Sequence, residues 1–253
     1  MNMTPVEIPD FMPAPEPAPM NAAARVANVF FSPGKAFADI ARRPSWWVPV
    51  VLAMVLTTTY LYMFSQRVGW EFFFRQQNAQ SVQMQQLDAA TRARTEALQV
   101  LIGTYLTWGA GLVGPLIGAL LMAGILKFMA DTILGAGIGF KKTLAAVTYG
   151  TLPNLLKTCL AMIVLQIKPP DEFDLQNPVM VNGAVFLPAN AAAWMKTLGS
   201  SLDLFTIWCM VLIAIGIAAG AKRMSAGKAF AMMLFPWALW VILATAYAAV
   251  ART

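Results

Sequence analysis

Residues 30–50, FFSPGKAFADIARRPSWWVPV, join a short amphipathic segment to a long apolar one. Helices favour serine at the N-cap and proline at the first helical position, so Ser32 and Pro33 predict a helix start. With 3.6 residues per turn, one face then carries Ala36, Phe37 and Ile40. The opposite face carries the charged side chains of Lys35, Asp39, Arg42 and Arg43, with Lys35–Asp39 and Asp39–Arg43 as i, i+4 pairs.

This helix is expected to end at Pro44, and Trp46 and Trp47 follow it directly. Paired tryptophans before an apolar run are typical of the aromatic belt at a membrane surface. The pattern therefore predicts an amphipathic helix at the inner membrane surface, anchoring the first transmembrane helix. Packing of this helix on the inner loops of the chain itself is an equally good interpretation of the same pattern.

Composition places the whole chain in the same class. Of 253 residues, 58% are hydrophobic and 12% are charged, whereas soluble domains have roughly 45–50% apolar and about 25% charged residues. So little charge cannot cover a soluble surface. The fold class that we predict is an all-α polytopic membrane protein.

Five apolar runs are long enough to cross a bilayer, which takes about 20 residues of helix. They cover residues 46–64, 98–128, 143–167, 201–221 and 229–250. The second run is too long for one upright span, and we expect it to bend at Gly114 and Pro115, because proline removes a helical hydrogen bond. Residues 1–24 are expected to form a disordered, proline-rich cytosolic tail, and residues 25–253 the membrane domain.

Lysine and arginine near the span ends indicate the orientation. With the N-terminus inside, ten of these residues lie on the inner side and seven on the outer side, with Lys157 left within a span. We therefore predict a cytoplasmic N-terminus and an external C-terminus.

The loops also carry local signals. Residues 66–99 predict an extramembrane helix that leads into the second span. Asn182 and Gly183 lie between two β-favouring runs, which predicts a type I′ hairpin. The sequence ANAAAWMKTLGSS after them predicts a short interfacial helix.

The chain lacks the residues and motifs that most classes of enzyme require. The chain has no histidine, and it contains no GxSxG, Walker A, CxxC or HExxH pattern. The sequence GAGIG at residues 135–139 lacks the βαβ context of a nucleotide-binding fingerprint, so we interpret it as a turn. Cys159 and Cys209 lie in apolar runs and are interpreted as free thiols. We predict no enzymatic activity, no cofactor, no metal and no nucleic-acid binding.

Ionisable and polar groups inside the membrane are the candidate functional residues, because burial there is costly. Lys157 lies in the middle of the third span, Asp203 near the outer end of the fourth, and Asp131 follows the second. Asn154 lies beside Pro153 at an expected kink. A polar path and a purely structural pairing of Lys157 with Asp203 are both consistent with these positions.

Two GxxxG spacings allow close packing of helices. They are formed by Gly114 with Gly118 and by Gly216 with Gly220. Packing within the chain is the main interpretation, and homodimerisation is the alternative.

The stretch VFFSPGKAFADIARRPSWWVPV resembles the opening motif of bacterial members of the Yip family, the Rab-interacting membrane proteins that share the Yip-one domain. Two further stretches, AVTYGTLPNLL and LGSSLDLFTIWCMVLIAIGIA, agree with it. The resemblance implies five spans and a cytosolic N-terminus. Eukaryotic relatives bind small GTPases of the Rab type, but their Asp-Leu-Tyr-Gly-Pro motif is missing from this chain, so we do not predict GTPase binding.

The function that we predict is a membrane scaffold or membrane-organising role, like those of trafficking proteins, in the bacterial inner membrane. It would act through contacts with lipid or with partner proteins. The alternative is a transport component, a permease subunit or lipid-moving protein, that uses Lys157, Asn154 and Asp203.

Overall fold

The computed structural model describes residues 18–79, 82–173, 175, 177–188 and 190–250. Helices dominate these ranges, and no β-strand occurs within them, which confirms the predicted all-α class. Most of the tail expected over residues 1–24 lies outside them, although the first helix already begins at Ala22. The helices are α1 (Ala22–Phe31), α2 (Pro33–Arg42), α3 (Trp47–Arg67), α4 (Trp70–Ala79), α5 (Val82–Gln85), α6 (Ala89–Leu134), α7 (Phe140–Gly150), α8 (Leu152–Ile167), η1 (Pro170–Glu172), η2 (Gly183–Phe186), α9 (Ala193–Ser201), α10 (Leu204–Gly220) and α11 (Ala226–Val250).

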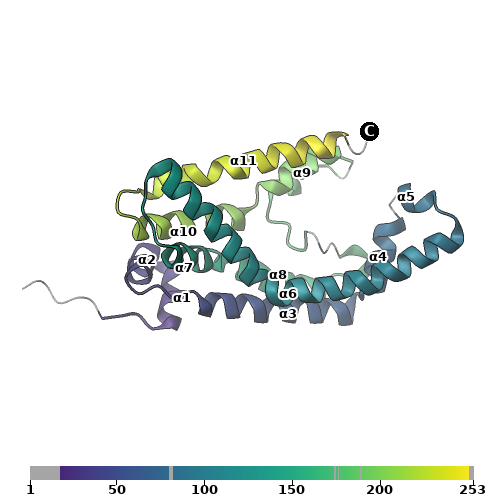
Figure 1. Ribbon diagram of the computed structural model, residues 1–253. Coiled ribbons are helices and arrows are strands. Elements are labelled where there is room, and N and C mark those ends of the chain that lie inside the picture. Colours follow the sequence, from purple (N-terminus) through teal and green to yellow (C-terminus); the bar gives the residue numbers. More distant parts are fainter. Residues whose placement is uncertain (1–17, 80–81, 174, 176, 189, 251–253) are drawn as a thin grey trace, which may run out of the picture.

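Four helical segments are long and apolar enough to cross a membrane: α3, α6, the α7–α8 pair and α11. The fourth span expected from the sequence is α10, whose 17 residues measure about 26 Å against a hydrocarbon core of about 30 Å. The short helix α9 precedes it, and both α9 and α10 pack against α11 (Figure 1). The fourth run therefore corresponds to α10 alone, which begins at Leu204, and Leu202 and Asp203 separate it from α9.

The second run belongs to a much longer helix. The 46 residues of α6 span about 69 Å, more than twice the hydrocarbon thickness. Pro115 lies inside this helix, and Figure 1 shows that α6 changes direction near its middle without a break. Asp88 caps its start by accepting hydrogen bonds from the backbone N–H groups of Ala90 and Thr91.

The extramembrane helix expected over residues 66–99 is divided. The chain turns after α3 at Gly69, which has a φ of 83° and so a conformation that favours glycine. It then forms α4 and α5 before α6 begins. Aromatic side chains around the buried Phe64 and Trp70 hold this turn against α8 and the following loop.

The third run is also interrupted. α7 ends at Gly150 and α8 begins at Leu152, with Thr151 between them and Pro153 in the first turn of α8. Gly150 lies against Ile213 of α10, where an added Cβ would come within 2.8 Å of a backbone nitrogen. Close contact between α7 and α10 therefore requires glycine at this position.

The prediction of a type I′ hairpin at Asn182 and Gly183 is wrong. Asn182 instead caps the 3-10 helix η2, its Oδ1 accepting a hydrogen bond from the Ala184 N–H at 3.1 Å. Gly183 packs against Gly199 of α9, so this turn folds back onto a helix and does not join two strands. The interfacial helix expected nearby is α9, which packs against α11.

The position of α2 decides between the two interpretations of the amphipathic segment, contact with the membrane surface and packing on the chain itself. Ala36, Phe37 and Ile40 are almost fully buried against α7 and α10 of the same chain. Ser32 occupies the N-cap of α2 without a side-chain hydrogen bond, and Pro33 is the first helical residue. The apolar face of this helix thus covers the bundle and is not free for lipid.

The two GxxxG spacings differ in their surroundings. A Cβ added at Gly216 would come within 2.8 Å of both Ala146 and Phe37, so this glycine permits close packing within the chain. Gly220 lies similarly against Ile138. Around Gly114 and Gly118, in contrast, a Cβ would meet nothing within 4 Å, so the close helix packing expected there is not found.

Gly216→Val is expected to lower the stability of the fold by about 1–3 kcal/mol, the range for overpacking a well-packed core. Gly124→Val is the matched control, because a Cβ added at Gly124 of α6 would meet nothing within 4 Å. The thermal unfolding midpoint of purified protein in detergent micelles measures both. Equal midpoints for the two variants would contradict close packing of α2 and α7 on Gly216.

Candidate functional site

The structure brings together two of the residues that the sequence singled out. Lys157 of α8 donates from Nζ to Oδ2 of Asp203 at 2.8 Å, a bond that joins residues 46 positions apart. The Asp203 side chain is 6% exposed and that of Lys157 is 28% exposed. The pair therefore joins the third and fourth apolar runs inside the bundle.

Asp203 holds several elements at once. Its other oxygen, Oδ1, accepts hydrogen bonds from the Thr206 N–H and hydroxyl, which caps α10. Its backbone forms an isolated bridge with Asn182, flanked by the bonds Gly183 N–H to Leu202 O and Leu204 N–H to Val181 O. The side chain and backbone of Asp203 thus join the start of α10 to the first half of α8 and to the η2 turn.

The pair occupies a defined depth in the bundle. Lys157 lies ten residues, or about 15 Å, before the end of α8. Asp203 lies within reach of this side chain, so the start of α10 is fixed beside α8. Both charges are satisfied by each other, so neither presents a free ionised group to a bound molecule.

Asp131 lies in the last turn of α6 and pairs with Lys127 one turn before it. Its Oδ1 also accepts a hydrogen bond from the Ile138 N–H at 3.0 Å, and Lys127 Nζ donates to the Ile138 carbonyl at 3.1 Å. The turn between them, GAGIG, contains Gly135 and Gly137 with positive φ. This confirms the interpretation of that sequence as a turn, which the ion pair holds closed.

A second buried ion pair was not predicted. Asp39 is buried and accepts a hydrogen bond from Arg25 Nε at 2.7 Å, so it does not pair with Lys35 or Arg43 as expected. Arg25 Nη1 also donates to the Ser45 hydroxyl at 2.8 Å. The cluster ties α1, α2 and the entry to α3 together. Spacing along the helix favoured the local partners, because a partner 14 residues away leaves no periodic signal.

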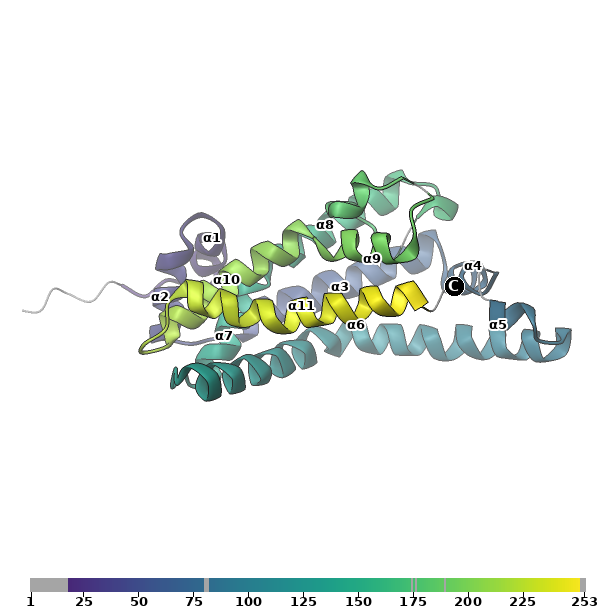
Figure 2. The same ribbon diagram turned by 90° about the horizontal axis from the view of Figure 1, so that it is seen from above.

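The remaining cations at this end of the bundle point outward. In Figures 1 and 2, α1, α2, the α6–α7 turn and the α10–α11 turn all lie at one end of the molecule, on the left. We call this end the basic end, because it carries a group of exposed cations. They are Lys35, Arg42, Arg43, Lys141, Lys222, Arg223 and Lys228. Within the described residues the acids at this end are Asp39 and Asp131, both already paired.

Comparison with known protein families matches residues 27–248 to the Yip1 domain. The chain belongs to the Yip1 domain family. The match covers nearly all of the membrane domain that the sequence outlined. No curated protein and no solved structure matches the chain.

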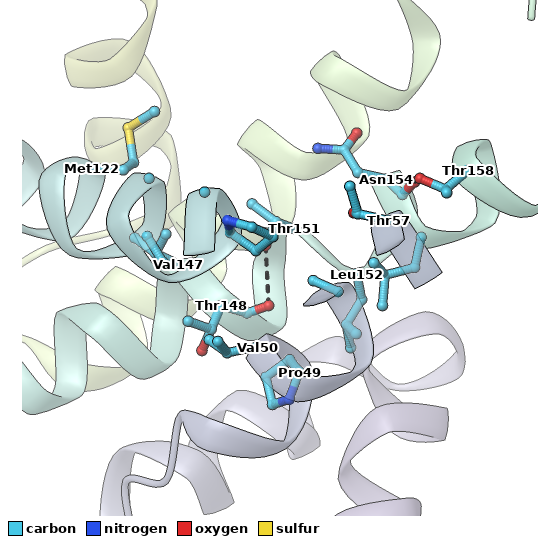
Figure 3. A pocket seen from close by; sticks show the side chains of 16 residues that line it. Pro49, Val50, Thr57, Met122, Val147, Thr148, Thr151, Leu152, Asn154 and Thr158 are labelled. Carbon is cyan, nitrogen blue, oxygen red and sulfur yellow. Dashed lines mark hydrogen bonds between the residues drawn. The ribbon is translucent and has the colours of Figure 1, made fainter. Parts of the chain in front are cut away.

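In this Yip1 domain, Asn154 lines a space that the ion pair does not reach. Asn154 lies in the first turn of α8 and lines a cavity between α3, α6, α7 and α8, to which neither Lys157 nor Asp203 contributes (Figure 3). The polar path expected through all three residues is therefore not continuous in the lining of this cavity.

The other predicted residues lie at the basic end. Trp46 packs against the core, while Trp47 is 59% exposed at the first residue of α3. Pro44 follows the end of α2, as expected. Cys159 and Cys209 are free, and among residues 18–250, leaving aside the undescribed positions, no group of three His, Cys, Asp or Glu could hold a metal ion.

Lys157→Met is expected to destabilise the Yip1 domain by roughly 2 kcal/mol, because it leaves the buried Asp203 carboxylate without its cation. The double variant Lys157→Met/Asp203→Asn should recover most of this loss, since asparagine keeps a capping oxygen for α10. Thermal unfolding in micelles gives the coupling through a double-mutant cycle. Lys141→Met, at an exposed lysine with no ion pair among the described residues, is the control. An equal loss there would contradict the role of the pair.

Proposed function

We propose that this Yip-family protein is a non-enzymatic membrane scaffold that gathers anionic lipid head groups at its basic end. The observation that carries the proposal is the distribution of exposed charge. The basic end has seven exposed cations, and the acids there within the described residues are engaged in ion pairs. The opposite end mixes both signs, with Arg67, Arg75, Arg92, Arg94, Lys168 and Lys196 among Glu71, Asp88, Glu96, Asp171 and Glu172.

Buried contacts also fix the helices of the basic end in place. The Arg25–Asp39–Ser45 cluster joins α1 and α2, and the buried face of α2 fixes both helices on α7 and α10. Lys35, Arg42 and Arg43 therefore project from a rigid support. Each cation near an anionic membrane surface is worth about 1 kcal/mol, so seven of them favour binding of several head groups at once.

The same asymmetry supports the orientation of the chain. Cytoplasmic loops carry the excess of lysine and arginine in membrane proteins. We infer that the basic end, with the N-terminus, faces the cytoplasm of a bacterial cell and that the C-terminus lies outside the inner membrane. Anionic lipids of the cytoplasmic leaflet, and membrane proteins that gather with them, are then the partners within reach.

A second candidate function, transport, is favoured by the interruption of the third span. Discontinuous helices with polar residues at the break are a feature of transporter binding sites, and the break here lies at Thr151, between α7 and α8. If the protein is a transport component, purified protein in liposomes moves solutes or lipids across the bilayer, and Lys157→Leu abolishes the flux. Absence of flux from folded protein argues against this candidate.

The scaffold is tested by lipid enrichment. Protein carrying a fluorophore is reconstituted into phosphatidylcholine vesicles with a small fraction of labelled phosphatidylglycerol, and energy transfer reports enrichment around the protein. We expect enrichment over labelled phosphatidylcholine. The variant Arg42→Gln/Arg43→Gln/Lys222→Gln/Arg223→Gln should reduce it several-fold, and high salt should reduce it in the wild type, because salt screens exposed charge.

The matched control removes the same charge from the opposite end, in Arg67→Gln/Arg75→Gln/Arg94→Gln/Lys168→Gln. This variant should keep the enrichment close to that of the wild type. An equal fall in both variants, or no fall in the first, would contradict a role of the basic end.

A further inference from the structure

A cavity of about 350 Å³, open in part to the surface, lies between α3, α6, α7 and α8 (Figure 3). This volume lies within the range of sites that bind small molecules, about 300–1,000 Å³. Its lining combines apolar side chains with one amide and four hydroxyl groups and contains no charged residue. The polar members are Thr57, Thr148, Thr151, Asn154 and Thr158.

Small side chains leave this space open. Gly114 and Gly118 of α6 line the cavity, and a Cβ added at either glycine would meet nothing within 4 Å. Ala53 lines it from α3, and Pro115 lies at the bend of α6. A larger side chain at Gly118 would therefore enter the cavity without a clash against its nearest neighbours.

Two polar groups of the lining lack a side-chain hydrogen bond among the described residues: the Asn154 amide and the Thr57 hydroxyl. In contrast, the Thr151 and Thr158 hydroxyls donate to carbonyls of their own helical segments, at 3.1 and 3.0 Å. Thr57 is the central residue of the 21-residue α3, and Asn154 lies at the centre of the 28-residue segment Phe140–Ile167. Asn154 is exposed and Thr57 is half-buried, so both can face the hydrocarbon. Unpaired polar groups that face hydrocarbon at mid-membrane depth are costly, so a molecule that hydrogen-bonds to them is stabilised there.

We infer that this cavity binds a neutral lipid, a mainly hydrocarbon molecule with one uncharged hydroxyl or carbonyl group held by Asn154. The uncharged lining and the depth of Asn154 exclude a phospholipid head group, which needs cations and the membrane surface. A second copy of the chain is a poor occupant, because a hollow cannot fill an identical hollow across a two-fold axis. The site is separate from the basic end, and the scaffold role does not require it.

Photolabelling of the full-length protein in vesicles tests the site. Three diazirine probes with the same chain are compared: a long-chain alcohol, the corresponding hydrocarbon and a phosphatidylglycerol. The alcohol is expected to label the residues of the lining about fivefold more than the hydrocarbon does, the ratio that one hydrogen bond gives. Asn154→Leu should remove this preference.

Gly118→Leu should abolish labelling of the lining by filling the cavity, and Gly124→Leu, also at an open position of α6, should leave it unchanged. Ala53→Leu fills the cavity from α3 and replaces Gly118→Leu if that variant does not fold. Labelling that survives both filling variants overturns the inference. So does equal labelling by alcohol and hydrocarbon, or stronger labelling by the phosphatidylglycerol probe. Loss of lipid enrichment at the basic end would not affect this result.

Discussion

A charge inside a bilayer needs a counter-charge within reach of its side chain, and this requirement organises the second half of the bundle. Lys157 lies about 15 Å before the end of α8, and Asp203 meets it at 2.8 Å. Because Asp203 also caps α10, the ion pair fixes the start of that helix to α8. The short helix α9 ends just before Asp203, and α11 packs against both α9 and α10.

A second buried ion pair fixes the packing of helices near the N-terminus. Arg25 and Asp39 neutralise each other in the interior and link α1 to α2. Because the Asp39 charge is paired, α2 can pack closely on α10, with Phe37 against Gly216. A methyl group at position 216 would already be too large for this contact. The remaining cations of α2 are left facing outward. Burial of one pair thus determines which charges reach the surface.

Much of the architecture follows from local pattern. Apolar length located the membrane helices, and Ser32-Pro33 and Pro44 located the ends of α2 within a residue or two. Features that depend on a distant partner were not predictable in the same way. Asn182-Gly183 has the composition of a hairpin turn, but Gly199 and Asp203 lie against it and impose a 3-10 turn. Likewise, GxxxG spacing identifies small residues, but only the fold shows that Gly216 meets a neighbour and that Gly118 borders a cavity.

The length of α6 has a mechanical consequence. The helix runs from the Asp88 cap, beside α4, to the closed turn at Asp131 and Ile138. Its bend at Pro115 lies between these two anchors. Proline cannot donate a helical hydrogen bond, so bending of α6 is easiest at this point. One continuous helix with a single weak point thus connects the α4 end of the structure with the basic end.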